Sequence, residues 1–357
     1  MASLSYFQGG SWVDFPYEKT PRKPKIEVTH ATQDFVCFTL SDTDTSVANA
    51  LRRIIMAEVP TMAIETVSVF ENDTVIFDEF IAHRMGLLPL SSHCVGDIPP
   101  DCDAPGACVL QKDCNCYDGC MRCTREFRLD VTNTEDQILS VTHFDVVDDH
   151  PGSKQFEDPS APENGKVRIC PFRDVNLTEE ENRRDNGILI AKMAKDNRLS
   201  MTCRAVKGIP KYHAKFMPVA TVSVRNPAII TLDREQVDSL SLEERIELVE
   251  SCPRRTLGLD EFDKVQVMNP EECTFDDEVI TKAKELGKKD MVKVKMDCNT
   301  FIFKVEAVTP DGPRSVIDVV RASMRIFDYK LSSFLEDAFG DPITDWLPQT
   351  SMSGYDL

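Results

Sequence analysis

The chain lacks several features that define common functional classes. No apolar run approaches the roughly 20 residues that a membrane-spanning helix needs. Positive charge is in the minority, because 41 Lys and Arg stand against 60 Asp and Glu in 357 residues, a formal net charge of −19. This deficit argues against a freestanding nucleic-acid-binding protein, whose affinity comes mainly from neutralised phosphates. The first residues have neither a basic start nor an apolar core, so we expect no secretory signal.

Signatures of nucleotide binding and of common catalytic centres are also missing from the sequence. It contains neither a G-x-x-x-x-G-K-[ST] nor a G-x-G-x-x-G segment. None of the six histidines stands in a nucleophile motif with Ser or Cys, and His83 and His213 are interpreted as hydrogen-bonded structural residues. With 41% hydrophobic and 28% charged residues, the composition is that of a chain that buries a core. Together these features favour a protein of the cytosol or the nucleus with two or three domains.

Cysteine, by contrast, is abundant, with 13 in the chain and seven of them between Cys94 and Cys123. In a reducing compartment such a cluster more often binds metal than forms disulfides. The six cysteines elsewhere are interpreted as small buried hydrophobic residues: Cys37, Cys170, Cys203, Cys252, Cys273 and Cys298.

Four cysteines of the cluster lie within ten residues at the spacing C-x-C-x3-C-x2-C: Cys114, Cys116, Cys120 and Cys123. Gly119 eases the turn between them. Four thiolates suit tetrahedral Zn²⁺ and leave no open position, so we expect one structural zinc ion that orders a segment poor in apolar residues. A four-cysteine iron–sulfur cluster and unligated thiols are the alternatives. Competing ligands lie nearby: His93, Cys94, Cys102 and Cys108.

Hydrophobic periodicity predicts an α+β fold. The expected strands cover residues 25–30, 35–40, 64–70, 124–131, 139–146, 187–194, 199–205, 219–224 and 300–308, with a hairpin around 195–197. The first expected helix is capped by Asp42, Asp44 or Thr45 and ends at Pro60. Four more helices are expected at 78–86, 241–250, 275–286 and 315–339, and a Ser241–Glu244 capping box opens the helix at 241–250. Residues 1–24 are expected to form a loose arm, and 148–165 a polar loop.

The first and last helices carry apolar stripes that are wider than one small sheet requires. In the last helix the stripe runs from Val316 to Ala338 in steps of three and four. Such a helix often packs on a partner helix. A basic segment, residues 207–216, could contact nucleic acid or an acidic protein, or form an ordinary surface loop. From the residues alone, the prediction is a zinc-stabilised α+β protein with an oligomerisation surface.

Three segments resemble the eukaryotic and archaeal branch of the RNA polymerase α family: TSVANALRRIIMAEVP (45–60), DEFIAHRMGLLPL (78–90) and KGIPKYHAKFMPVA (207–220). The four-cysteine cluster is similar to the zinc loop of the third-largest subunits of RNA polymerase II. The related subunits of polymerases I and III usually lack that loop. The resemblance extends from about Lys25 to Phe339.

The resemblance implies a split α-like dimerisation domain, a sheet plus two packed helices, formed by residues 1–61 and 217–339 and followed by a tail, 340–357. A β-rich insert domain, 62–216, would carry the zinc loop at about 91–123. In this family the helix at 46–59 and the long C-terminal helix make a four-helix contact with a smaller α-like subunit.

The resemblance further implies a non-catalytic structural and assembly subunit of nuclear, DNA-directed RNA polymerase II, with one structural zinc ion per chain. Its partners would be the smaller α-like subunit, the second-largest subunit and small zinc-bearing subunits, with no direct template contact and no membrane. The alternatives are the α-like subunit shared by polymerases I and III, or a freestanding zinc hydrolase or redox protein. The implied partner contacts are Leu51, Arg52, Arg53, Ile54, Lys207, Lys211, His213, Lys215, Val320, Met324, Phe327 and Leu331.

Overall fold

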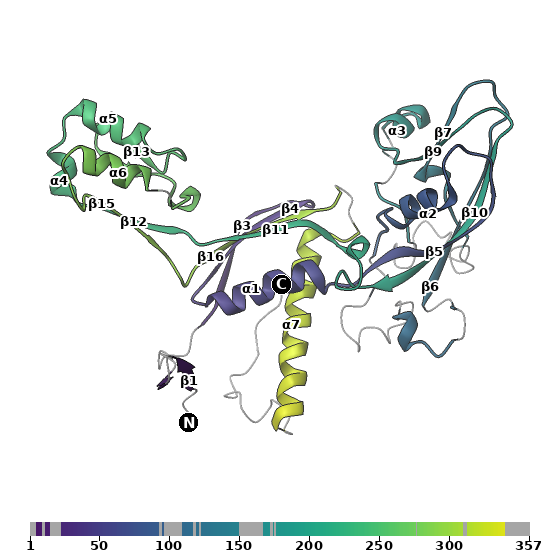
Figure 1. The fold of residues 1–357 in the computed structure, drawn as a ribbon, viewed down its shortest axis with the longest axis horizontal. Coiled ribbons are helices and arrows are strands. Elements are labelled where there is room, and N and C mark those ends of the chain that lie inside the picture. The colour runs from purple at the N-terminus through teal and green to yellow at the C-terminus, as the bar shows by residue number, and fades with distance from the viewer. Residues whose placement is uncertain are drawn as a thin grey trace. The chain divides into compact units, whose positions relative to one another are not determined.

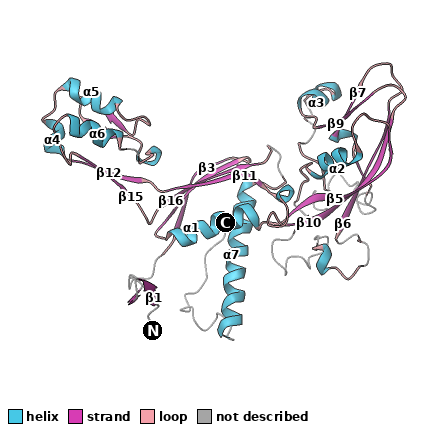
Figure 2. Cartoon of the chain, viewed as in Figure 1, coloured by secondary structure: helices cyan, strands magenta, loops and turns pink. Residues whose placement is uncertain are grey.

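The structure is a computed structural model, drawn in Figures 1 and 2. It describes residues 23–92, 95, 109–116, 119–120, 123–149, 167–171, 174, 176–275, 277–309 and 313–339, and the backbone of two earlier strands. The chain divides into two compact units. The smaller unit contains Met1–Glu27, Thr39–Ala48 and Arg225–Ile302, and the larger unit contains Val28–Phe38, Asn49–Val224 and Phe303–Leu357. Helices and strands occur in both, which confirms the α+β class.

A four-stranded antiparallel sheet organises much of the larger unit. Its strand order is β5 (Thr61–Asn72), β10 (Arg198–Gly208), β6 (Thr124–Thr132) and β8 (Val147–Asp148). Helix α2 (Asp78–Gly86), predicted with the same bounds, buries Ile81 and Met85 in the core that this sheet forms. Burial of such side chains contributes on the order of 1.5–3 kcal/mol each, and this anchors the helix to the strands.

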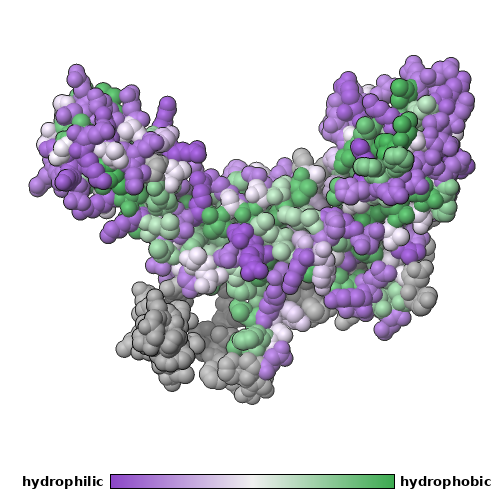
Figure 3. All heavy atoms as spheres, in the orientation of Figure 1, coloured by the Kyte–Doolittle hydropathy of each residue, from purple (hydrophilic) through white to green (hydrophobic). Residues whose placement is uncertain are grey.

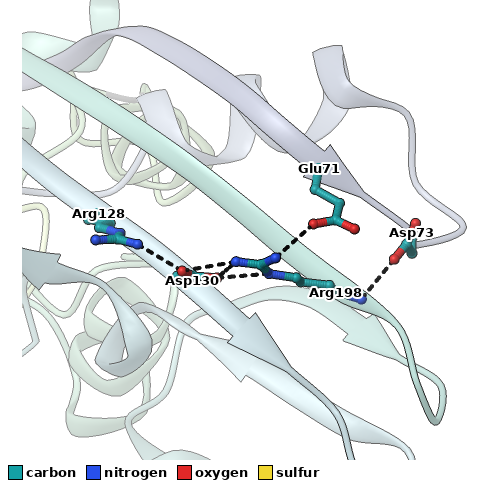
Figure 4. A network of polar contacts seen from close by, with 5 residues as sticks. All are labelled: Glu71, Asp73, Arg128, Asp130 and Arg198. Atoms are coloured by element: carbon teal, nitrogen blue, oxygen red, sulfur yellow. Dashed lines mark hydrogen bonds and ion pairs between the residues drawn. The ribbon is translucent and has the colours of Figure 1, made fainter.

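Arg198 connects three neighbouring strands on the exposed face of this sheet, as Figure 4 shows. Its guanidinium lies 3.1 Å from Glu71 of β5 and 3.2 Å from Asp130 of β6. Asp130 also accepts a hydrogen bond from Arg128, at 2.9 Å, and the backbone N–H of Arg198 donates to Asp73. Since cross-strand pairs of opposite charge stabilise one register over its neighbours, this network favours the observed alignment.

The hairpin predicted around residues 195–197 is wrong. Strand β9 (Leu189–Met193) pairs with β7 (Leu139–Thr142), not with β10. Both edges of β10 are already occupied by β5 and β6, so β9 has no edge of β10 to join. The strand expected at 139–146 is also shorter, because a 3-10 helix, His143–Asp145, follows β7.

A second sheet has the order β11 (Val219–Arg225), β16 (Phe301–Ala307), β4 (Phe35–Ser41) and β3 (Lys25–Ala31). Phe38 and Phe303 stack across it at 4.7 Å between ring centroids, and both are almost fully buried. These strands lie close to the predicted bounds: β4 alternates buried and half-buried positions, β16 begins with three buried residues, and β3 is exposed throughout.

Helix ends follow their capping residues. Helix α1 (Thr45–Ala57) begins after Asp44, whose carboxylate accepts from the N–H groups of Ser46 and Val47. The capping box of Ser241 and Glu244 opens α5 (Leu242–Glu250), as predicted. Helix α7 (Val316–Phe339) begins where Ser315 bonds Asp318. Helix α6 (Glu278–Glu285) is shorter than expected, because Phe275 has a φ of 57°, outside the right-handed helical region.

The smaller unit has a core of its own, made by strands and helices that the sequence only partly predicted. It contains β12 (Ala228–Leu232), β13 (Leu257–Leu259), β14 (Val265–Val267), β15 (Val292–Met296) and α4 (Arg234–Asp238), together with α5 and α6. Leu248 of α5 is fully buried there, beside Val237 and Val279. The four strands were missed because each has only three to five residues, too few for a clear alternation.

Two further differences concern the N-terminal arm and helix α3. Strands β1 (Ser5–Gln8) and β2 (Ser11–Asp14) pair antiparallel in a region expected to be loose. Helix α3 (Glu179–Asp185) was missed, although its Thr178–Glu181 capping box is visible in the sequence. Most of the loop expected at 148–165 and the tail at 340–357 lie outside the described residues. Within the described part of the chain, no helix combines the length and hydropathy that crossing a membrane requires.

Candidate metal centre and partner surface

Four cysteine sulfurs meet in the larger unit, and all lie within 4.8 Å of one another. Cys114 Sγ lies 3.5 Å from Cys120 Sγ, and Cys123 Sγ lies 3.4 Å from Cys116 Sγ and 3.8 Å from Cys120 Sγ. At the usual Zn–S distance of about 2.3 Å, the edges of a sulfur tetrahedron are about 3.8 Å long. The four predicted ligands therefore form a donor set that could hold one tetrahedral metal ion.

A tight turn immediately before β6 brings these sulfurs together. Gly119 has a φ of 94°, and a Cβ there would approach Thr124 Cγ2 to 2.8 Å. The N–H groups of Cys123 and Thr124 both donate to the carbonyl of Cys120, at 3.0 and 2.9 Å. The N–H of Cys120 points at Cys123 Sγ, 3.3 Å away, a contact that stabilises negative charge on sulfur. The start of β6 thus anchors the second half of the cluster.

Without a cation, Cys114 and Cys123 favour the neutral thiol. Burial raises the pKa of Cys123 to about 12. The pKa of Cys114 is also raised: the strongest influence, the backbone N–H of Cys116, lowers it, but hydrogen bonds with the neighbouring thiols outweigh that effect. A metal ion must therefore displace protons when it binds. The competing ligands His93, Cys94, Cys102 and Cys108 lie outside the described residues.

Helix α7 has two halves with different surroundings. Its first half is packed within the chain, where Val319 and Ala322 are buried. In its second half Leu331 is 50% exposed and Phe334 is 66% exposed, with Leu335 also exposed. Figure 3 shows hydrophobic residues on the surface of this helix. The apolar stripe predicted from the sequence thus continues beyond the part of α7 that is buried by the described residues.

The other implied contacts on the two helices are placed differently. Leu51 and Ile54 of α1 are each only 4% exposed, and Val320 of α7 is also buried, so these three side chains pack within the chain. Arg53 is exposed, whereas Arg52 bonds to Asn49 and Met56 on its own helix. Two further implied contacts on α7 are half-buried: Met324 and Phe327. Phe334 was not among the implied contacts, although it continues the same i, i+3 pattern from Leu331.

Comparison with known proteins decides the family. The family described as the RNA polymerase Rpb3/Rpb11 dimerisation domain matches residues 37–331. The chain is 36% identical over 290 residues to "DNA-directed RNA polymerases II, IV and V subunit 3" of Arabidopsis thaliana, covering 80% of this chain and 83% of that protein.

The chain belongs to the Rpb3/Rpb11 dimerisation family of RNA polymerase subunits.

More distant members of this family are also similar to the chain. "DNA-directed RNA polymerase II subunit rpb3" of Dictyostelium discoideum is 32% identical over 314 residues, 87% of this chain and 93% of that protein. The human subunit of RNA polymerases I and III, RPAC1, is 29% identical over 335 residues, 92% of this chain and 87% of that protein. The similarity to both kinds of subunit agrees with the family resemblance found in the sequence.

In this family member, the basic segment at 207–216 presents only its tip to solvent. Lys207 is buried, and Lys215 turns inward to bond with Glu65 and the carbonyl of Ile64. The tip is exposed and consists of Lys211, Tyr212, His213 and Ala214. The lysine side chains at the two ends of the segment are thus largely buried in the fold, and only the tip can contact another molecule.

Other sequence interpretations are resolved by burial and hydrogen bonding. His213 Nδ1 accepts from the N–H of Lys215, which confirms a structural bond for that histidine. His83 is exposed, and its side chain makes no hydrogen bond to the described part of the chain, so the hydrogen bond expected for its imidazole is not found there. Cys170, Cys203 and Cys252 are buried as predicted, whereas Cys298 is exposed.

Proposed function

We propose that this chain is a non-catalytic structural and assembly subunit of nuclear, DNA-directed RNA polymerase II, acting in mRNA transcription. The relatives from Arabidopsis thaliana and Dictyostelium discoideum carry names of polymerase II subunits, at 36% and 32% identity. The observation that carries the structural role is the exposed apolar half of α7 in a chain that matches a dimerisation family over residues 37–331. Exposed apolar faces of this kind mark protein interfaces.

The partner at this face would be the smaller α-like subunit, in a heterodimer. Leu331, Phe334 and Leu335 lie on adjacent turns of α7, where a partner helix could cover them together. The proposed dimerisation domain comprises residues 1–61 and 217–339, the insert domain 62–216, and the tail 340–357. In the absence of a partner, we expect the exposed stripe to drive aggregation or self-association.

Co-expression with the smaller subunit tests this role. The wild-type chain should co-purify with it at equal stoichiometry, and Leu331→Glu or Phe334→Glu should lower recovery at least about tenfold, because a charge would be buried in the interface. Glu336→Lys, a substitution at another exposed position of α7, is the matched control and should co-purify normally. Clean monomeric behaviour of the wild-type chain at high concentration, without a partner, would overturn the proposal.

The four-cysteine cluster would hold one structural Zn²⁺ per chain through Cys114, Cys116, Cys120 and Cys123. Its sulfur separations support a closed tetrahedral site, in which no position is left for substrate water. Elemental analysis should find about one zinc per chain, lost in Cys120→Ser but kept in Cys298→Ser. A zinc-free chain would favour the subunit shared by polymerases I and III, and visible charge-transfer bands from bound iron would favour an iron–sulfur cluster.

The remaining contacts are proposed from the family resemblance and the exposure of the residues. The second-largest subunit or small zinc-bearing subunits would meet the loop tip at Lys211, Tyr212 and His213, and a large subunit would meet Arg53. No direct template contact is proposed, since the chain is strongly acidic. Mass spectrometry of co-purifying proteins tests these contacts. Catalytic turnover that survives purification to one chain would instead favour a freestanding zinc protein.

A further inference from the structure

Helix α5 in the smaller unit carries an exposed apolar ridge that involves neither the cysteine cluster nor α7. Leu242 is 48% exposed and Ile246, one turn further along the same face, is 38% exposed. Leu248 of the same helix is fully buried and attaches α5 to the core of the smaller unit. The helix is therefore anchored through one face while a second apolar strip remains at the surface.

A turn bonded to α5 carries a third exposed apolar side chain. The guanidinium of Arg245 donates to the backbone carbonyl of Asp263 at 3.0 Å and to that of Asp238 at 2.9 Å, which holds the 260–263 turn against the helix. Phe262 in this turn is 78% exposed. The carboxylate of Asp260 accepts from the N–H groups of Phe262 and Lys264, so the turn is internally fixed. Arg245 thus ties the turn that carries Phe262 to the helix that carries Leu242 and Ile246.

Carboxylates surround these apolar residues. The α5 segment 241–250 and the turn 260–263 contain seven acidic residues and a single basic one, Arg245. Glu243 and Glu250 are exposed on α5, and Glu261 is exposed in the turn. On the lobe that carries α5, Figure 3 shows small hydrophobic areas within a largely hydrophilic surface. Such a surface attracts cations and repels other acidic proteins, including further copies of this chain, whose net charge is −19.

We propose that the α5 ridge, formed by Leu242, Ile246 and Phe262, is a docking site for a basic amphipathic helix of a partner protein. The apolar face of that helix would cover the three side chains, and its lysines or arginines would face the carboxylates on either side. Apolar contact supplies affinity, while the surrounding charges select a basic partner and speed the encounter. The site shares no residue with the proposed α7 interface.

A labelled synthetic peptide tests this site on the full chain in complex with the smaller α-like subunit. The probe is a helical Leu/Lys peptide of about 14 residues, long enough for roughly four turns, with leucines along one face. Fluorescence anisotropy should show saturable binding that weakens at high salt. Phe262→Ser and Ile246→Ser should each weaken binding about tenfold, as expected at an apolar centre of contact. Glu243→Lys with Glu250→Lys should weaken it further.

Matched variants separate this site from general attraction to an acidic protein. Met296→Ser removes an apolar side chain of similar exposure on β15, and Glu278→Lys reverses a charge on α6; neither should change binding more than about twofold. A peptide of the same composition with scattered leucines should bind at least about tenfold more weakly. Equal binding of both peptides, or equal effects of Phe262→Ser and Met296→Ser, would overturn the proposal. Unchanged circular dichroism of the Phe262→Ser variant would establish that its weaker peptide binding does not come from unfolding.

Discussion

Lys330 Nζ of α7 lies 2.5 Å from Glu58 Oε2, one residue beyond the end of α1, although 272 positions separate the two residues. The pair stands at the transition between the packed and the exposed halves of α7. It therefore marks where the buried half of α7 gives way to the exposed half. The side chain of Lys330 is 52% exposed and that of Glu58 is 22% exposed, so solvent screens their attraction.

A double-mutant cycle of Glu58→Gln and Lys330→Gln should give a coupling energy below about 1 kcal/mol that falls with added salt. By comparison, Ile326→Ala, at a site that is 7% exposed, should cost about 2–5 kcal/mol, because it leaves a cavity under the packed half of α7. Urea unfolding of the full chain with its partner, followed by circular dichroism, measures both. A coupling energy above that of the cavity would mean that charge, and not apolar packing, positions the helix.

Gly208→Ala should destabilise the larger unit by about 1–3 kcal/mol, because a Cβ would lie 2.5 Å from the ring of buried Phe216. The ring has little room to move, since buried Phe216 packs in a cluster with Ala63 and Val206. Chemical denaturation measures the loss. Combining Gly208→Ala with Phe216→Leu should recover part of it, and strictly additive effects of the two changes would contradict this contact.

Arg198→Ala should lower the melting temperature more at about pH 7 than at about pH 3. Desolvation raises the pKa of Asp130, but hydrogen bonds and attraction from Arg128 and Arg198 outweigh it, and the pKa is lowered. The stability from ionised Asp130 is thus present above the unfolded carboxyl pKa, about 3.9, and lost as the pH falls through the lowered folded value. Differential scanning calorimetry measures the difference in melting temperature between the wild-type chain and Arg198→Ala at each pH. Equal losses at both pH values would show that the arginine acts through packing alone.

Zinc affinity should fall steeply on acidification, with up to about four protons taken up per ion released. The raised pKa of Cys123, about 12 without a cation, means that its thiol is protonated at neutral pH until metal displaces the proton. Titration calorimetry in buffers of different ionisation enthalpy counts these protons. Cys298→Ser should leave the count unchanged, whereas pH-independent affinity would exclude thiolate ligation.

Several features of this protein could be predicted because their causes lie within a few residues. The caps at Asp44 and Ser241 and the bounds of α2 follow from hydrogen bonds and periodicity over one or two turns. The ligand set at Cys114 to Cys123 followed from its spacing, since ten residues around Gly119 can turn back on themselves.

Features that depend on distant residues could not be predicted from these patterns. Nothing near Lys215 indicates that its charge turns inward to Glu65, 150 positions earlier. Likewise, the stripe on α7 looks uniform in the sequence, and only the fold divides it into the buried Val319 and the exposed Phe334.

The sequence by itself determined helices α1, α2, α5 and α7, the caps at Asp44 and Ser241, the spacing of the four clustered cysteines and the resemblance to a polymerase subunit family. Only the tertiary structure decided that β10 pairs with β5 and β6 instead of β9, which lysines are buried, and which half of α7 faces outward. The physical reason is range: capping and periodicity act between residues a few positions apart, whereas strand pairing and burial depend on which distant segments compete for the same edge or surface.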